Sequence, residues 1–563
     1  MGDVIEYIVD GTSGLSPGDV SGSCIIAGVC SLGEAGKGYL LGASSDLEGL
    51  LGVGPLVDRL RDLFATAGQK PVVVAVPVAG SAGGYISNLE HTGEGPDSAV
   101  AGVPAGNADV VVKITTAGVL GTAAYSLSLD GAETFAEAET TAANGQISIG
   151  TTGATLTLGE GTQVVDDLYS FVVRTAIGPV EKTGTGPDIT VTGTVKAAAE
   201  IMLGVVSGGG LNEATYQLST DGGDAFDVER TVPVDGVITV GSTGVTITVP
   251  DETLVAGDIY ECRLLPPVPS ISGVMTAIEG PLELYDVEFV YVVGPTDSVD
   301  WAVMGAKADT QFNAHRPVFF LSEYRLPYAD EDLNDWVAEA VNESNDYAHR
   351  FVAVCASVAE VSDVTGQTIL RNPAGLLAGR ILATPVMRAI GRVRDAGISQ
   401  AALPDDYTSS MQVMLESARY ITLKRYAGLS SAYWGDGKTM ADVTSDYQYL
   451  EVLRVVFKAV RKARIAALKS MYDEAGDPVM EGEDTGLQYL KANIETALNT
   501  LVSAVPKELA AHQVSIPSGQ DIVNNGVAVE MVLIGIPIIR SISLFASYVY
   551  AGSTFDPRLE TTD

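Results

Sequence analysis

The segment Gly33-Glu-Ala-Gly-Lys37-Gly38 has the residue types of a loop that binds phosphate through its backbone amides. A nucleotide-binding loop of this kind needs Gly-x-x-x-x-Gly-Lys followed by Ser or Thr, because the hydroxyl binds magnesium. Here Ser31 stands in place of the first glycine, and Gly38 stands in place of the hydroxyl residue. We therefore expect a tight loop and no nucleotide site.

Two segments resemble the Asp-box signature of sialidases and other β proteins: Ser128-Leu-Asp-Gly-Ala-Glu-Thr-Phe135 and Ser219-Thr-Asp-Gly-Gly-Asp-Ala-Phe226. In such a box the aspartate accepts backbone hydrogen bonds at a hairpin turn, and the aromatic residue packs beneath it. Asp-Gly between alternating strands predicts the same turn. A sialidase site would also need a cluster of arginines, whereas Arg174 is the only arginine between residues 92 and 182. The boxes therefore indicate structural turns.

Histidine spacing supports neither zinc hydrolysis nor a serine triad, because no His-Glu-x-x-His pattern or Gly-x-Ser-x-Gly elbow is present. The acidic run 221–227 could hold calcium weakly, but it lacks the EF-hand spacing and the closing glutamate. We therefore expect no enzyme, no cofactor and no metal site. The four histidines are His91, His315, His349 and His512.

One cluster of positive charge stands out in an acidic chain. The protein has 33 basic and 71 acidic residues, for a formal net charge of −38. Six basic residues nevertheless fall within residues 445–472, a segment without Gly or Pro that is typical of a long helix. This cluster is either an ordinary solvated face or a dock for an acidic partner. Assigned to the docking face are Arg454, Lys458, Arg461, Lys462 and Lys469.

Composition limits the partners and the compartment. The acidic balance argues against nucleic acid, since phosphate binding needs a basic face. Four scattered cysteines without a Cys-x-x-Cys pair indicate no disulfide framework. The N-terminal residues lack the features of a signal peptide. The longest apolar run, Met531–Ile539, falls short of the roughly 20 residues that cross a bilayer. We expect folding in a cytoplasm and no membrane insertion.

An internal repeat with a spacing of 91 residues divides the chain. Thr92-Gly-Glu-Gly-Pro-Asp97 returns as Thr183-Gly-Thr-Gly-Pro-Asp188, and Tyr125–Gly131 returns as Tyr216–Gly222. A register held this long indicates two copies of one small fold. Alternating apolar residues and Asp-Gly turns predict antiparallel strands. We expect two tandem all-β domains, each an Ig-like sandwich, at residues 92–182 and 183–269.

The flanks of the repeat favour a different, mixed α/β fold. Strand-like runs and helical periodicity alternate before the repeat and resume after it, as in Val72–Val78 and Arg316–Leu321. We expect a discontinuous α/β core formed by residues 23–91 and 270–525. Further helices are predicted at about 331–348, 409–419 and 486–512.

Both ends of the chain are predicted to be extended arms, at residues 1–22 and 526–563. Each contains strand-like residues without an evident partner strand next to it in sequence. Such strands gain backbone hydrogen bonds if a neighbouring subunit completes the sheet. The residues assigned to contacts between subunits are Ile5, Tyr7, Val9, Val529, Met531, Ile534 and Ile539.

Several segments outside the repeat follow one another as in a known family. In the N-terminal part these are Ile25–Gly28, Gly36–Gly38, Ser44–Leu47, Leu50–Gly52 and Val72–Val78; in the C-terminal part they are Tyr420–Gly428, Tyr433–Asp436, Met440-Ala441, Ser445–Gln448 and Leu453–Val456. Together they resemble the contractile tail sheath proteins of bacteriophages and related injection systems, in particular the Mu-like branch.

The resemblance implies a structural subunit that polymerises helically around an inner tail tube. It implies stacked rings, expected to be hexameric, that contract to drive the tube through the host envelope. Its partners would be other copies of itself, the tail tube protein, and the baseplate and tail terminator proteins. The subunit would assemble in the host bacterial cytoplasm and end in the virion tail. The basic cluster would then face the tube in the extended state.

Two other functions could account for the tandem β domains. A secreted or surface adhesin that binds glycans would carry such domains but would need a signal peptide. A glycan-cleaving tail enzyme would account for the Asp-box segments but would need an acidic, tyrosine-rich site that the sequence does not supply. Electron microscopy of the purified protein would separate these alternatives.

Overall fold

A six-stranded sheet lies at the centre of the computed structural model, which describes residues 19–68, 71–80, 83–329, 331–345, 347–362, 368–476, 484–551, 553 and 557–559. Its order is β2-β3-β1-β23-β24-β25, and all neighbouring strands except β2 and β3 run parallel. The strands are β1 (Ser23–Val29), β2 (Tyr39–Leu41), β3 (Val72–Val78), β23 (Phe289–Thr296), β24 (Phe319–Tyr324) and β25 (Val352–Cys355).

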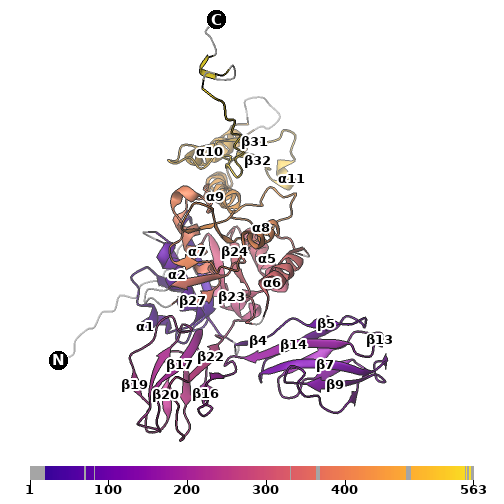
Figure 1. Ribbon diagram of the computed structural model, residues 1–563. Helices are drawn as coiled ribbons and strands as arrows, with labels where there is room; N and C mark the ends of the chain where they lie inside the picture. The colour runs from indigo at the N-terminus through magenta and orange to yellow at the C-terminus, as the bar shows by residue number, and fades with distance from the viewer. Residues whose placement is uncertain are drawn as a thin grey trace, which may run out of the picture.

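Helices cover both faces of this sheet (Figure 1), which accounts for the continuous apolar runs of its strands. α2 (Pro55–Thr66) and α7 (Ala374–Ala383) lie together on one face, and α5 (Ser298–Asn313) lies on the other. The contact between α2 and α7 needs glycine, since a Cβ at Gly379 would lie 2.2 Å from the carbonyl oxygen of Leu63. The predicted mixed α/β class is confirmed.

Shorter elements complete the core. The remaining core helices are α1 (Leu47–Leu51), α3 (Ile271–Ala277), α4 (Glu279–Leu284), α6 (Leu333–Asn345) and α8 (Ser409–Ser417). Two small antiparallel sheets are formed by β26 (Ala359–Ser362), β27 (Thr368–Arg371) and β28 (Ala401–Ala402), and by β29 (Leu423–Arg425) and β30 (Ala432–Trp434).

Two β lobes are inserted between β3 and α3. Lobe 1 (residues 84–175) and lobe 2 (residues 181–264) each contain a larger and a three-stranded sheet around their own apolar core. The strands of lobe 1 are β4 (Gly84–Ile86), β5 (Glu90–Thr92), β6 (Ala99–Gly102), β7 (Ala108–Thr116), β8 (Gly118–Val119), β9 (Ala124–Ser128), β10 (Glu139–Thr140), β11 (Gln146–Ser148), β12 (Ala154–Thr157), β13 (Thr162–Gln163) and β14 (Leu168–Thr175). Those of lobe 2 are β15 (Glu181–Thr183), β16 (Thr190–Gly193), β17 (Ala199–Ser207), β18 (Thr215–Ser219), β19 (Arg230–Thr231), β20 (Val237–Thr239), β21 (Val245–Thr248) and β22 (Ile259–Leu264).

The lobes repeat one another strand by strand. β7 and β17 begin 91 residues apart, as do β9 and β18, which is the spacing of the sequence repeat. The chain leaves the core and returns to it at a single point, where Gly80 and Pro269 form an isolated antiparallel bridge. We call this point the joint.

Both Asp-box segments form the predicted turns with matching geometry. The Ser128 hydroxyl donates to Asp130 at 2.6 Å, and the Ser219 hydroxyl donates to Asp221 at the same distance. Each aspartate also accepts a backbone N–H four residues later, at 2.9 and 3.0 Å. The aromatic residues Phe135 and Phe226 remain more than two-fifths exposed, whereas the aromatic residue of a sialidase box packs beneath its turn.

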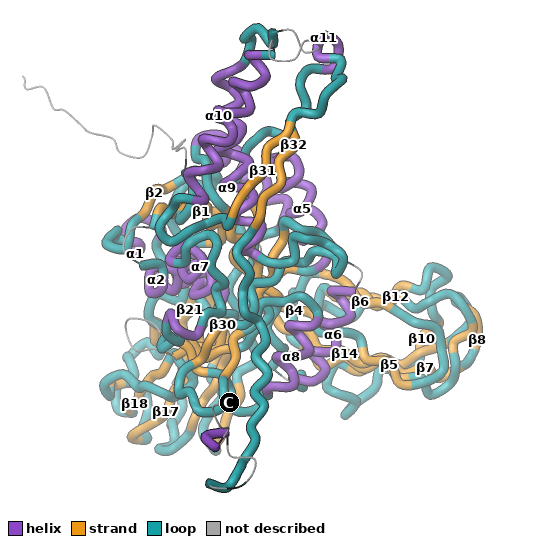
Figure 2. Tube along the Cα trace, turned by 90° about the horizontal axis from the view of Figure 1, so that it is seen from above, coloured by secondary structure: helices purple, strands orange, loops and turns teal. Residues whose placement is uncertain are grey.

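A smaller subdomain ends the described chain. It contains α9 (Leu450–Ala467), α10 (Thr485–Val502), β31 (Ala511–Ser515), α11 (Ile522–Asn525) and β32 (Glu530–Ile534). Figure 2 shows β31 and β32 running beside α9 and α10. The helix predicted for 486–512 ends at Val502, because Pro506 cannot continue a helix and Ala511–Ser515 pairs as a strand with β32.

Candidate assembly surfaces

The basic residues of α9 divide into a buried and an exposed group. Arg454 is buried and donates to the carboxylate of Glu288 at 2.6 and 3.2 Å. Arg461 is also buried and pairs with Asp286. The prediction that these two arginines face outward is wrong, because the two acids just before β23 draw both side chains into the core.

Lys458 lies between them and links distant parts of the chain. Its ammonium group contacts Asp19 at 2.8 Å and Glu508 at 2.7 Å. Burial alone would raise the pKa of Asp19, but hydrogen bonds from Lys458 and Ser21 bring that pKa below its usual value. Lys458 therefore has an internal role, against the prediction of a tube-facing one.

The far end of α9 and the turn after it carry the remaining basic group, in which Lys462 is half-buried and Arg464 and Lys469 are exposed. Lys462, Arg464 and Lys469 have no ion-pair partner among the residues that the structure describes. Apolar side chains surround them and are open to solvent; they include Ile465, Leu468, Met471 and Tyr472. We call this surface the basic tip. Of the five residues assigned to a docking face, Lys462 and Lys469 therefore remain able to contact a partner protein.

The C-terminal arm differs from its prediction in its first part. β32 pairs with β31 to form an antiparallel hairpin, with Met531 opposite Val514. Val529 and Met531 pack against the apolar core of the subdomain, so these two residues are not free to bind a neighbour. The sequence does not predict this pairing, because β31 begins inside a segment with helical periodicity.

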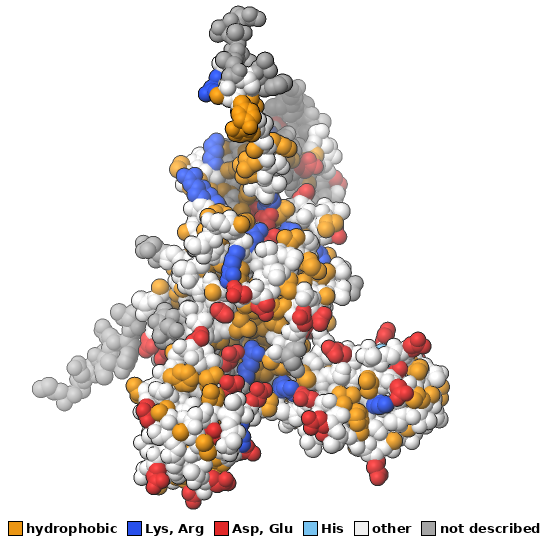
Figure 3. Space-filling model, in the orientation of Figure 1, with side chains coloured by type: hydrophobic (Ala, Val, Ile, Leu, Met, Phe, Trp, Pro, Cys, Tyr) orange, Lys and Arg blue, Asp and Glu red, His pale blue; other side chains and the backbone are white. Residues whose placement is uncertain are grey.

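After β32, residues 535–551 form no helix or strand, and the later part of this stretch extends away from the body (Figure 1). This segment, which we call the C-terminal segment, exposes large apolar side chains, some of them visible in orange in Figure 3. Leu544 is 90% and Phe545 96% exposed. Ile539 and, at the end of β32, Ile534 are exposed as well. The N-terminal arm residues Ile5, Tyr7 and Val9 lie outside the described residues.

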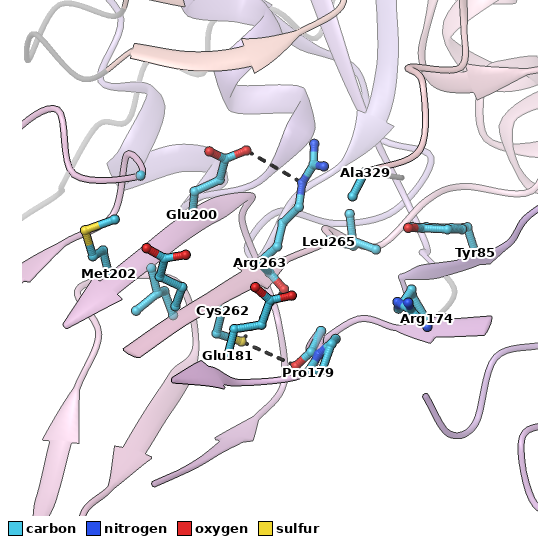
Figure 4. Close-up of a pocket in the computed structure, with 14 residues that line it drawn as sticks. Tyr85, Arg174, Pro179, Glu181, Glu200, Met202, Cys262, Arg263, Leu265 and Ala329 are labelled. Atoms are coloured by element: carbon cyan, nitrogen blue, oxygen red, sulfur yellow. Dashed lines mark hydrogen bonds and ion pairs between the residues drawn. The ribbon is translucent and has the colours of Figure 1, made fainter. Parts of the chain in front are cut away.

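A cavity of about 470 Å³ lies where the two lobes meet the core (Figure 4). Its floor is the outer face of the larger sheet of lobe 2, where Arg263 lies 3.7 Å from Glu200. Tyr85 and Arg174 of lobe 1 line the opposite side. The Cys262 thiol points away and donates to the Gly178 carbonyl oxygen, and burial raises its pKa to about 11.

Within the described ranges, no cluster of three or more His, Cys, Asp or Glu residues is arranged to hold a metal ion. Among the same residues, no helix has the length and apolar character to cross a bilayer. The candidate assembly surfaces are the basic tip, the β31–β32 hairpin and the C-terminal segment.

Comparisons with known proteins point to phage tails. The chain is 32% identical over 114 residues to a putative tail sheath protein of Haemophilus phage HP1. That alignment covers 18% of this chain and 30% of the relative, so the chain spans less than a third of the length of the relative that it matches.

Two solved sheath structures are also similar to this chain. A sheath tail protein of Desulfitobacterium hafniense aligns over 95% of this chain and all of its own, at 12% identity and a TM-score of 0.43. The sheath of an extracellular contractile injection system, in its contracted state, covers 52% of this chain and 76% of its own, at 15% identity and a TM-score of 0.38. Likenesses this distant do not transfer a mechanism.

The Haemophilus phage relative confirms the resemblance to tail sheath proteins, and the Mu-like branch stays a prediction. Family models match almost the whole chain: DUF2586, N-terminal domain, matches residues 1–438, and DUF2586, C-terminal domain, matches residues 446–553. The chain belongs to the DUF2586 family.

Proposed function

We propose that this protein is the structural subunit of a contractile tail sheath and that it is not an enzyme. The observation that carries the proposal is the C-terminal segment, a run of exposed apolar side chains beyond the last strand. Contiguous apolar surface of this kind marks an interaction site in a soluble protein. The subunit polymerises helically around an inner tube, and contraction of the polymer drives the tube through the host envelope.

Strand addition is the proposed link between subunits. The β31–β32 sheet has two strands within the described chain, so its outer edges can accept strands from other copies. Its proposed partners are the N-terminal arm with Ile5, Tyr7 and Val9, and the C-terminal segment with Ile539. A link that joins one surface to a different one repeats as an open helix, here of stacked hexameric rings.

Assembly is proposed to take place in the host bacterial cytoplasm, and the product belongs to the virion tail. The other partners would be the tail tube, baseplate and tail terminator proteins. Negative-stain electron microscopy of the purified protein tests the function. We expect tubes of uniform width, and a protein that stays monomeric at high concentration and in high salt would overturn the proposal.

The two lobes are proposed to be separate domains on the outside of the tube. Residues 92–269 hold 23 acidic and 6 basic residues (23 − 6 = 17, a net charge of −17), so their surface favours solvent. The Gly80–Pro269 bridge supports this proposal, because it holds the two ends of the insert side by side.

Replacing residues 81–268 by a short Gly/Ser linker should leave a folded core that forms thinner tubes. The lobes have their own apolar cores, so their removal opens little of the central one. Tube diameter in electron micrographs is the measurement. Aggregation of the shortened protein, or loss of tubes, would show that the lobes make contacts that assembly needs.

Reversing the charge of the basic tip should weaken assembly on the tube more than assembly of the sheath alone. The variant is Lys462→Glu with Lys469→Glu, and neither residue has an internal partner to lose among the described residues. Exposed charge contacts weaken with salt, so the difference should shrink as ionic strength rises. Co-sedimentation with purified tube measures it, with Lys196→Glu on lobe 2, an exposed lysine without an ion-pair partner among the described residues, as the control. Equal loss of both kinds of assembly would place the tip between sheath subunits.

A further inference from the structure

One arginine ties the C-terminal segment to the body of the subunit. The Arg540 guanidinium donates from Nε to Asp436 at 2.8 Å and from Nη2 to Glu451. It also lies over the Tyr449 ring, with 3.5 Å between the guanidinium carbon and the ring centroid. Asp436 follows β30, while Tyr449 and Glu451 flank the first residue of α9, so elements far apart in the sequence build the contact. We call Asp436, Tyr449 and Glu451 the socket.

The socket is shaped for a guanidinium group. A planar cation can stack on an aromatic face while its edges donate to two carboxylates, and a lysine ammonium cannot do both. Glu451 is buried, and its second carboxylate oxygen has no hydrogen-bond partner among the described residues. Burial raises the pKa of Glu451, and Arg540 acts against that rise by favouring the ionised form. A carboxylate held in this way depends on its cation.

Contact between the segment and the body ends at this residue. Before it, Gly535–Ile538 and Arg540 itself line a cavity of about 240 Å³ with Val452, Val455 and Leu533, and Ile538 is half-buried. After it, every residue from 541 to 551 is exposed. In the described part of the C-terminal segment, Arg540 supplies the polar contacts to the body of the subunit.

We propose that the socket is a guanidinium-binding site whose occupant is Arg540, and that it fixes the point from which residues 541–551 leave the subunit. Fixing one end of an exposed apolar segment confines the volume that the segment explores, and it lowers the entropic cost of ordering the segment on binding. Arg540 is therefore a positioning residue for assembly. The role of Arg540 in assembly rests on the proposed function, whereas the binding of Arg540 by the socket concerns the isolated subunit.

Distance measurement on the isolated subunit tests the site directly. Spin labels are placed at Ser543 in the segment and at Val413 on α8, both exposed, with the half-buried Cys30 replaced by serine. We expect a narrow distance distribution that becomes at least twofold broader in Arg540→Ala and stays broad in Arg540→Lys. Arg464→Ala, which removes an exposed arginine of α9 outside the socket, should leave the distribution narrow.

Two further variants and an assembly assay complete the test. If Arg540→Ala misfolds, Glu451→Gln weakens the socket with little change of volume and should broaden the distribution as well. Unchanged narrow distributions in the variants that fold would overturn the site, whatever the protein assembles into. Tube formation followed by light scattering should be about tenfold slower in Arg540→Ala. A broad distribution with a normal assembly rate would overturn the positioning role, while absence of tubes from the unmodified protein would count against the proposed function alone.

Discussion

Arg454→Ala should destabilise the subunit by about 3–5 kcal/mol, the cost of breaking one side of a buried ion pair. The Arg454 and Glu288 side chains are 1% and 5% exposed. Without the guanidinium, the carboxylate of Glu288 would keep only the backbone N–H of Gly22 at 2.9 Å as a remaining hydrogen bond given by the structure. Urea unfolding followed by circular dichroism measures the change.

Two matched variants separate this effect from a general loss of charge on α9. Arg464→Ala removes an exposed arginine of the same helix and should change the free energy of unfolding by less than about 0.5 kcal/mol. The double variant Arg454→Met with Glu288→Gln removes both charges and should recover most of the stability, since no charge is left buried alone. A loss below about 1 kcal/mol for Arg454→Ala would contradict the buried pair.

Ending the chain after Arg540 should abolish tube formation and leave the subunit folded. The deletion keeps the β31–β32 hairpin and the socket, and it removes the exposed apolar residues of 541–551. Because these residues have little contact with the body, their loss should not lower the melting temperature. Electron microscopy and sedimentation velocity measure assembly, and we expect monomers at concentrations that give tubes from the full chain.

The matched control is Ser541→Ala with Ser543→Ala, which changes two residues of the same segment and keeps its apolar side chains. Deletion of residues 1–18 tests the other arm. That deletion stops before Asp19, because Asp19 contacts Lys458 and Val20 is buried. Normal tubes from both truncated proteins would refute strand addition through the arms.

Local pattern was enough to predict the longer strands of the central sheet and the two β copies. A continuous apolar run such as Val72–Val78 specifies a buried strand, and a 91-residue register specifies a repeated fold without reference to any partner. The Asp-Gly turns were predictable for the same reason, since Asp130 and Asp221 form their hydrogen bonds within four residues.

Local sequence pattern could not predict the contacts between residues that lie far apart in the sequence. The local sequence predicts that Arg454 and Arg461 lie on an exposed face, because their partners lie about 170 residues away in the sequence. A signal was nevertheless present. The arginines are two helical turns apart, and Asp286 and Glu288 are two residues apart, so each pair shares one face of its element. The hairpin of β32 and the contact of Arg540 with Asp436 depend on tertiary packing in the same way.

The joint also bears on how the subunit reaches its native state. Strand β1 pairs with both β3 and β23, yet the two ends of the insert, Gly80 and Pro269, are 189 positions apart in the sequence (269 − 80). Closing a flexible loop of that length costs about 3 kcal/mol more than closing a turn of about five residues. Once the lobes are folded, they hold the two ends together, and the loop behaves as a short one. Folding of the lobes before the core therefore removes most of that entropic barrier, and since the lobes leave the ribosome before β23 does, the order of synthesis and the favourable order of folding coincide.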